Sequence, residues 1–131
     1  MQDKALVVID IQNDITKNYK EIIGNINAAV ERAVAKDMHV VSDNIFIKSK
    51  GNALTSEGFA AFIEVHGIKE FYVAGADAVA CVKTTCYNMA KSGYAVHVLS
   101  DCITSYDKRK IPEMLDYYER VGCRVESLAS F

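Results

Sequence analysis

The sequence lacks the features that mark several classes of protein. It has a single proline, and its apolar runs, such as residues 5–9, are far too short to span a bilayer. It also has no basic excess, because 15 lysines and arginines face 17 aspartates and glutamates, for a net charge of −2. These absences argue against a disordered chain, a membrane protein and a nucleic-acid-binding protein.

The four cysteines form no C-x-x-C motif, and no glycine-rich phosphate-binding motif follows any predicted strand. Residues 1–4 lead directly into an apolar run, so we expect no signal peptide and a cytoplasmic location. Thiols in that reducing compartment are expected to stay unpaired. The sequence therefore disfavours a disulfide scaffold, a thiol-redox protein and a nucleotide-binding domain.

What the sequence does contain is an alternation of strand and helix patterns, with hydrophobic residues making up 50% of the chain. Apolar runs typical of strands buried in a parallel sheet occur at residues 4–10, 39–42, 44–47, 70–75, 94–99 and 123–128. Helical periodicity occurs at residues 22–34, 59–66, 81–92 and 111–121. The buried face of the first helix is predicted to hold the apolar residues that recur every four positions, Ile22, Ile26, Val30 and Val34.

Glycines mark the ends of three predicted helices. Gly67, Gly93 and Gly122 each stand between a helical pattern and a strand, where a left-handed residue commonly ends a helix. Repeated helix–glycine–strand units favour right-handed crossovers between parallel strands. We therefore predict one α/β domain over residues 1–131, a three-layer αβα sandwich with a mostly parallel, Rossmann-like sheet of about five or six strands.

Two polar residues follow predicted strands, at the edge where parallel sheets bind ligands. Asp10 follows the first strand, and Cys81 opens a helix shortly after another strand. A thiol at a helix N-terminus is favoured as the nucleophilic thiolate by the helix dipole and by unpaired N–H groups. Because cysteine is usually a buried core residue, Cys86, Cys102 and Cys123 are interpreted as apolar fillers.

Three blocks of the sequence resemble the isochorismatase-like cysteine hydrolases, a family that includes nicotinamidases and related amidases. Residues 5–14 (ALVVIDIQND) are similar to the family's opening strand with its Asp-x-Gln-Asn-Asp signature. Residues 47–54 (IKSKGNAL) are similar to its lysine segment, and residues 73–101 to its nucleophile segment. The resemblance covers nearly the whole chain in order, including the closing residues 122–125 (GCRV).

The resemblance implies a catalytic triad and a reaction. The triad maps onto Asp10, Lys48 and Cys81, with Lys50 as the alternative to Lys48. In these roles Cys81 attacks a carbonyl carbon, Asp10 moves the proton and Lys48 lies beside both. The implied activity is hydrolysis of a C–N bond in a small amide-type molecule through a thioester. The alternative is a degenerate family member that binds a small ligand or a protein partner without turnover.

The resemblance also implies an oxyanion hole. Its donors are the backbone N–H groups of Asp77 and Cys81, and the cis peptide bond of the family maps onto the Ala76–Asp77 bond. A carboxylate at position 77 that faced the sulfur would oppose thiolate formation, so we expect it to face away.

Two departures from the family pattern shape the expected site. Asp10 and Lys48 are only 38 residues apart, so the substrate pocket is expected to be open or to be completed by another subunit of a homo-oligomer. His39, His66 and His97 are widely separated in the sequence, whereas a metal site needs converging ligands. We therefore predict no metal and no other cofactor, which disfavours a zinc-dependent nicotinamidase.

Overall fold

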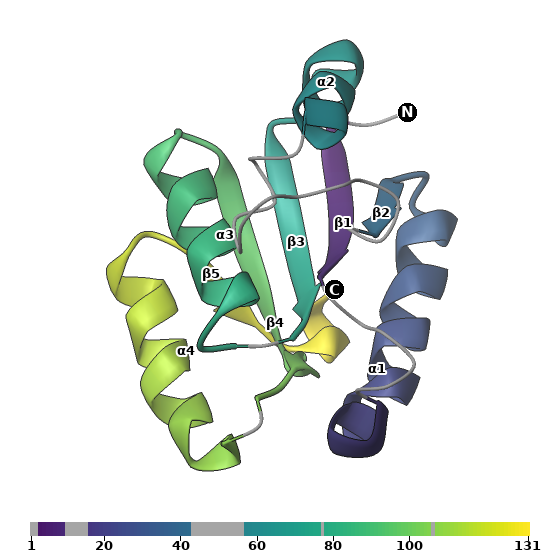
Figure 1. The fold of residues 1–131 in the computed structure, drawn as a ribbon. Coiled ribbons are helices and arrows are strands. Elements are labelled where there is room, and N and C mark those ends of the chain that lie inside the picture. The colour runs from purple at the N-terminus through teal and green to yellow at the C-terminus, as the bar shows by residue number, and fades with distance from the viewer. Residues whose placement is uncertain (1–2, 10–15, 43–56, 77, 106) are drawn as a thin grey trace.

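The computed structural model describes residues 3–9, 16–42, 57–76, 78–105 and 107–131, and it shows a parallel sheet between two helical layers (Figure 1). The strands are β1 (Lys4–Ile9), β2 (His39–Ser42), β3 (Glu70–Gly75), β4 (Ala95–Ile103) and β5 (Arg124–Glu126). The helices are α1 (Thr16–Ala35), α2 (Glu57–His66), α3 (Cys81–Lys91) and α4 (Ile111–Arg120), with 3-10 turns η3 (Lys108–Lys110) and η4 (Leu128–Ser130). The predicted α/β sandwich is confirmed, and the strand predicted at residues 44–47 lies outside the described residues.

The strand order places the ends of β1 and β3 side by side. The sheet runs β2-β1-β3-β4-β5, and every neighbouring pair is parallel. The chain moves outward from β1 in one direction to β2 and in the other direction to β3, β4 and β5. Such a reversal of strand order is the switch point at which open α/β sheets form ligand crevices. Here it lies at the carboxyl ends of β1 and β3, where Ile9 is in register with Gly75.

Each face of the sheet packs against its own layer of helices. One face contacts α1 through a cluster that includes Leu6, Val8, Ala74, Leu99, Ile22, Ile26, Ala29 and Ala33. The other face contacts α2, α3 and α4 through a larger cluster that includes Val7, Phe71, Val73, Val98, Phe59, Met89 and Tyr118. Burial of each large apolar side chain stabilises the fold by about 2 kcal/mol. None of the described helices is both long and apolar enough to cross a membrane.

The prediction that Val34 lies on the buried face of α1 is wrong. Val34 is 64% exposed, whereas Ala29 and Ala33 are fully buried. A repeat of four residues drifts about 40° per step on a helix of 3.6 residues per turn. After the steps from Ile22 to Val34 this drift carries the side chain out of the interface, and the small alanines let the helix approach the sheet.

The predicted helix ends are confirmed, whereas the predicted end of β4 is wrong. Gly67, Gly93 and Gly122 all have positive φ values, of 63°, 93° and 103°, as expected for residues that end helices. By contrast, β4 extends to Ile103, beyond the predicted end at residue 99. A register shift against β3 accompanies this extension. The polar residues Ser100 and Asp101 interrupt the apolar run and hide the continuation of the strand in the sequence.

Candidate active site

Cys81 lies where the sequence predicts it, at the first position of α3. Cys81 is half-buried and packs against the larger core cluster, which joins the sheet to α2, α3 and α4. Its N-cap residue, Ala80, offers no side-chain hydrogen bond to the first turn. The first N–H groups of a helix have no acceptor within the helix, and their dipoles favour negative charge nearby. The position therefore suits a thiolate and an anionic intermediate attached to it.

Gly75 brings the end of β3 close to the end of β1. Its φ is +121°, and a Cβ placed there would lie 2.1 Å from the carbonyl oxygen of Ile9. Only glycine fits this approach, which brings the strand that precedes Asp10 next to the turn that leads to Cys81. The sequence analysis used the glycines at helix ends but missed Gly75, whose signal is a glycine at the end of an apolar strand.

The other members of the predicted site fall outside the described part of the chain. These are Asp10, Lys48, the alternative Lys50, and Asp77 with the Ala76–Asp77 peptide bond. Their positions relative to Cys81 remain predictions from the sequence. The described residues that precede Asp10 and Asp77 in the chain, Ile9 and Ala76, are joined by a hydrogen bond from the Ala76 N–H to the Ile9 carbonyl oxygen at 3.0 Å.

The remaining cysteines are core residues, as predicted. All four cysteines are in the thiol form, and Cys86, Cys102 and Cys123 are buried. A hydrogen bond with Cys123, together with burial, raises the pKa of Cys86 well above its usual value. Burial and the charge of Asp101 raise the pKa of Cys102 to about 12. The Cys86 and Cys102 thiols therefore stay protonated near neutral pH and are poor nucleophiles. The hydrogen bond with Cys86 lowers the pKa of Cys123, but burial shields that thiol from reagents in solution.

We expect selective alkylation of Cys81 in the native protein. With iodoacetamide at pH 8, one of the four cysteines should react within minutes, because the other three are buried. Mass spectrometry of peptides should locate the label on Cys81, and the remaining thiols should react only after unfolding in guanidinium. Cys81→Ser should abolish the native label, whereas Cys86→Ser should keep it. Native labelling of Cys102 would contradict the burial described here.

The histidines do not form a metal site in the described part of the chain. His39 and His66, distant in the sequence, have ring centroids 4.7 Å apart, and both rings pack against Phe62. Among the described residues no group of three or more histidine, cysteine or acidic side chains is arranged to hold a metal ion.

His97 belongs to a polar cluster that the sequence analysis missed. Its Nδ1 lies 2.7 Å from an oxygen of Glu126, and its Nε2 is paired with Glu70. The Tyr72 ring packs on the imidazole with centroids 4.2 Å apart. Burial and then the charge of Glu70 raise the pKa of Tyr72 above its usual value. The acids come from β3 and β5 and the histidine from β4, so sequence spacing gives no sign that they meet.

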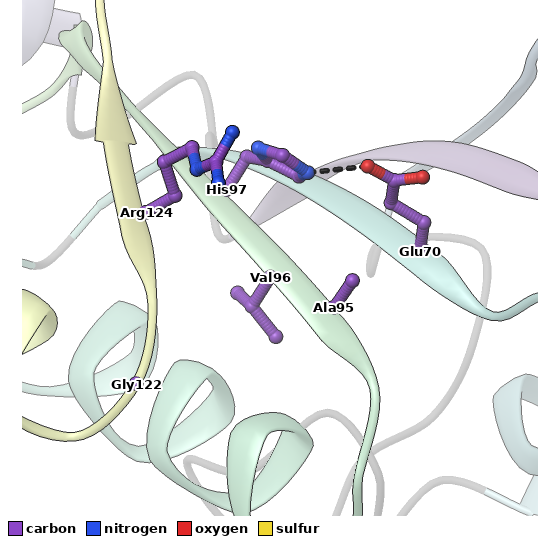
Figure 2. Close-up of a pocket in the computed structure, with 6 residues that line it drawn as sticks. All are labelled: Glu70, Ala95, Val96, His97, Gly122 and Arg124. Carbon is purple, nitrogen blue, oxygen red and sulfur yellow. Dashed lines mark hydrogen bonds and ion pairs between the residues drawn. The ribbon is translucent and has the colours of Figure 1, made fainter.

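A cavity of about 280 Å³ lies beside this cluster, lined by Glu70, Ala95, Val96, His97, Gly122 and Arg124 (Figure 2). Glu70, Ala95 and Arg124 begin their strands, so the cavity lies at the amino edge of the sheet. Cys81 lies beyond the opposite, carboxyl edge. The cavity is therefore separate from the candidate active site, and the His97 cluster acts as a link between three strands.

We expect His97→Leu to lower the free energy of unfolding by about 2 kcal/mol. The loss arises because Glu70 and Glu126, with side chains only 24% and 18% exposed, would both lose the imidazole. Glu70 would keep the longer contacts to Lys4 at 3.8 Å and to the Tyr72 hydroxyl at 3.5 Å. Urea unfolding measures the change. Adding Glu70→Gln to His97→Leu should recover part of the loss, since it removes one of the two carboxylates that faced the imidazole. Equal stability of the single variant and the wild type would show that the cluster contributes nothing.

Comparison with known proteins identifies the fold and the family of this chain. The family model for the isochorismatase domain matches residues 41–130. The fold superposes on an isochorismatase family protein from Desulfovibrio vulgaris with a TM-score of 0.85 and 15% identity, covering 99% of this chain and 96% of that one. N-carbamoylsarcosine amidase from Thermoplasma acidophilum gives 0.84 and 18%, covering 97% of each chain.

The nicotinamidase SaPncA from Staphylococcus aureus gives a TM-score of 0.80 and 16% identity, covering 95% of this chain and 100% of that one. No curated protein matches the chain in sequence. At these identities the structural similarity shows the fold alone. The family is shown by the family model, which spans well over half of the residues. The chain therefore belongs to the isochorismatase family.

Proposed function

We propose that this chain is a cysteine-dependent hydrolase that cleaves the C–N bond of a small amide-type molecule. Membership of the isochorismatase family supports a hydrolase, and two proteins of the same fold are an N-carbamoylsarcosine amidase and a nicotinamidase. The observation that carries the proposal is the place of Cys81. It opens α3 after the turn that follows β3, near the switch point of the sheet, and it is the least buried thiol of the chain.

The proposed reaction has two steps, each with its own proton transfer. In the first, Asp10 takes the thiol proton and the sulfur of Cys81 attacks the amide carbon, forming a C–S bond. The tetrahedral intermediate collapses, the C–N bond breaks, and the amine leaves with the proton from Asp10. In the second, Asp10 takes a proton from water, which attacks the thioester. The acid is then released and Cys81 regains its proton.

The remaining roles follow from charge. Lys48, with Lys50 as the alternative, is proposed to hold the Asp10 carboxylate and to favour the thiolate through its positive charge. The N–H groups of Asp77 and Cys81 are proposed to donate to the oxyanion of the intermediate, a contribution of about 3 kcal/mol per donor. The N-terminus of α3 supports the second of these donors, because a first-turn N–H points out of the helix.

The short segment between Asp10 and Lys48 bears on the substrate and on assembly. A shortened cover leaves the site more open, and we propose a homo-oligomer in which a second subunit closes it. Sedimentation velocity tests the assembly. A monomer that hydrolyses amides at full rate would contradict the need for a second subunit while leaving the chemistry intact.

An assay for ammonia release tests the proposed function. The wild type is incubated with a panel of small primary amides and carbamoyl compounds, and intact-mass spectrometry looks for an acyl adduct on Cys81. Ammonia release with a transient adduct supports the proposal. Binding of an amide with neither ammonia nor adduct would favour a family member that binds without turnover. Asp10→Asn should suppress both adduct and ammonia, because it removes the proton acceptor.

A further inference from the structure

The turn between β3 and Cys81 is fixed by backbone hydrogen bonds to both neighbouring strands. On one side, the N–H of Ala76 donates to the carbonyl oxygen of Ile9, at the end of β1, over 3.0 Å. On the other side, the N–H of Ala78 donates to the carbonyl oxygen of Thr104, just past the end of β4, over 2.9 Å. The ends of β1 and β4 therefore hold two described residues of the turn, Ala76 and Ala78.

A side chain from a distant helix provides a further fixed point. The hydroxyl of Tyr118, in α4, donates to the carbonyl oxygen of Ala78 over 2.5 Å. Both residues are fully buried, and they are 40 positions apart in the chain. The N–H and the carbonyl of Ala78 belong to successive peptide units, and each unit is planar. Thr104 and Tyr118 together therefore fix two consecutive peptide planes ahead of Cys81.

The next fixed plane carries the amide of Cys81 itself. The carbonyl oxygen of Ala80 accepts the N–H of Thr84 over 2.9 Å. That carbonyl and the N–H of Cys81 share one planar peptide unit and point in opposite directions. The Cys81 N–H thus points out of the helix N-terminus, in the direction where the proposed oxyanion would form. A single peptide unit, between Val79 and Ala80, separates this plane from the plane that carries the Ala78 carbonyl.

We propose that Tyr118 is a positioning residue that holds the turn so that the sulfur and the N–H of Cys81 face the substrate carbonyl together. This inference rests on the proposed function of Cys81. A tyrosine in a core needs a partner for its hydroxyl, and Tyr118 finds that partner in the turn ahead of Cys81. Without the hydroxyl the ring still fills the core, but the Ala78 carbonyl loses this donor and the peptide plane is less restrained.

The test is Tyr118→Phe, which removes one oxygen atom and keeps the ring. We expect kcat for amide hydrolysis to fall on the order of 10²-fold with KM little changed, as for a displaced catalytic group. We also expect slower alkylation of Cys81 by iodoacetamide, with the midpoint of its pH profile shifted upward toward that of a free thiol. This second readout needs no substrate.

Two substitutions on α4 serve as controls. Tyr117→Phe makes the same chemical change one residue away, where the ring contacts Lys83 and Arg120. Met114→Ala removes a buried side chain of the same helix and lowers stability without removing the hydrogen bond to the turn. Both should keep the pH profile of Cys81 alkylation at wild-type values. The proposal is overturned if Tyr118→Phe also keeps that profile while losing stability as Met114→Ala does.

The measurements separate this inference from the proposed function. If the wild type hydrolyses no amide, the proposed function fails, yet the alkylation profile of Tyr118→Phe still tests whether Tyr118 positions Cys81. If the wild type is active and Tyr118→Phe retains its kcat, the positioning role fails alone. All variants are compared well below their unfolding temperatures, determined by circular dichroism.

If Tyr118→Phe does not fold, hydrogen exchange of the Val79 and Cys81 amides in the wild type, with and without an alkylated Cys81, provides the comparison. Exchange as fast as in an unfolded chain would contradict a rigid turn.

Discussion

Gly75→Ala is expected to lower the free energy of unfolding by about 4 kcal/mol. A loss of this size is exceptional for a single substitution and needs a specific structural cause. The added Cβ would lie 2.1 Å from the carbonyl oxygen of Ile9, and φ at this position is +121°. Because the nearest atoms are backbone, neither strand can move aside without losing its pairing in the sheet. A loss of this size is a large share of the total stability of a small domain.

Gly24→Ala is the matched control for this prediction. Gly24 lies inside α1, is exposed, and has no atom within 4 Å of an added Cβ. Alanine there should raise the free energy of unfolding by about 0.5–1 kcal/mol, because glycine is a poor helix former. Urea unfolding of both variants should therefore give changes of opposite sign. Similar changes in the two variants would contradict the close approach of β3 to β1.

Cys81→Ser is expected to lower kcat for amide hydrolysis by at least about 10⁴-fold, as is typical for loss of a catalytic nucleophile. A serine hydroxyl has nearly the same size but does not ionise near neutral pH, so the N-terminus of α3 cannot convert it into an anion. Circular dichroism should show an unchanged fold. Ammonia release, followed with the best substrate of the panel, measures the loss.

Cys86→Ser controls for the loss of a thiol from the same helix. Cys86 is fully buried and its raised pKa keeps it protonated, so the variant should keep its activity per folded molecule. If instead Cys81→Ser kept activity within about tenfold of the wild type, the attacking group would not be the thiol. The acyl-enzyme route would then be wrong for this chain, while its family membership would stand.

Local patterns were sufficient to predict most of the architecture. The continuous apolar runs at β1 and β3 predicted buried parallel strands, and the glycines at helix ends predicted where the helices stop. These features depend on residues close together in the chain. For the same reason the position of Cys81 was predictable, because a strand, a turn and a helix start follow one another within a dozen residues.

Features that depend on contacts between distant residues were not predictable in this way. The His97 cluster joins three strands, and the bond from Tyr118 to Ala78 joins two elements 40 residues apart. The steric need for Gly75 becomes visible only once β1 is known to lie beside β3. The place of Asp10 after a strand was visible in the sequence, but its triad role and the choice of Lys48 came from resemblance to a family, since their spacing alone predicts no contact.

The position of β1 between β2 and β3 has a consequence for the kinetics of folding. Among the described strands β1 is synthesised before the others, and it has one partner close behind it in the chain, but its other partner begins only at Glu70. Until that segment is synthesised, one long edge of β1 has unpaired backbone groups, which invite association with other nascent chains. We therefore expect slow, late assembly of the sheet and a need for chaperones at high rates of expression.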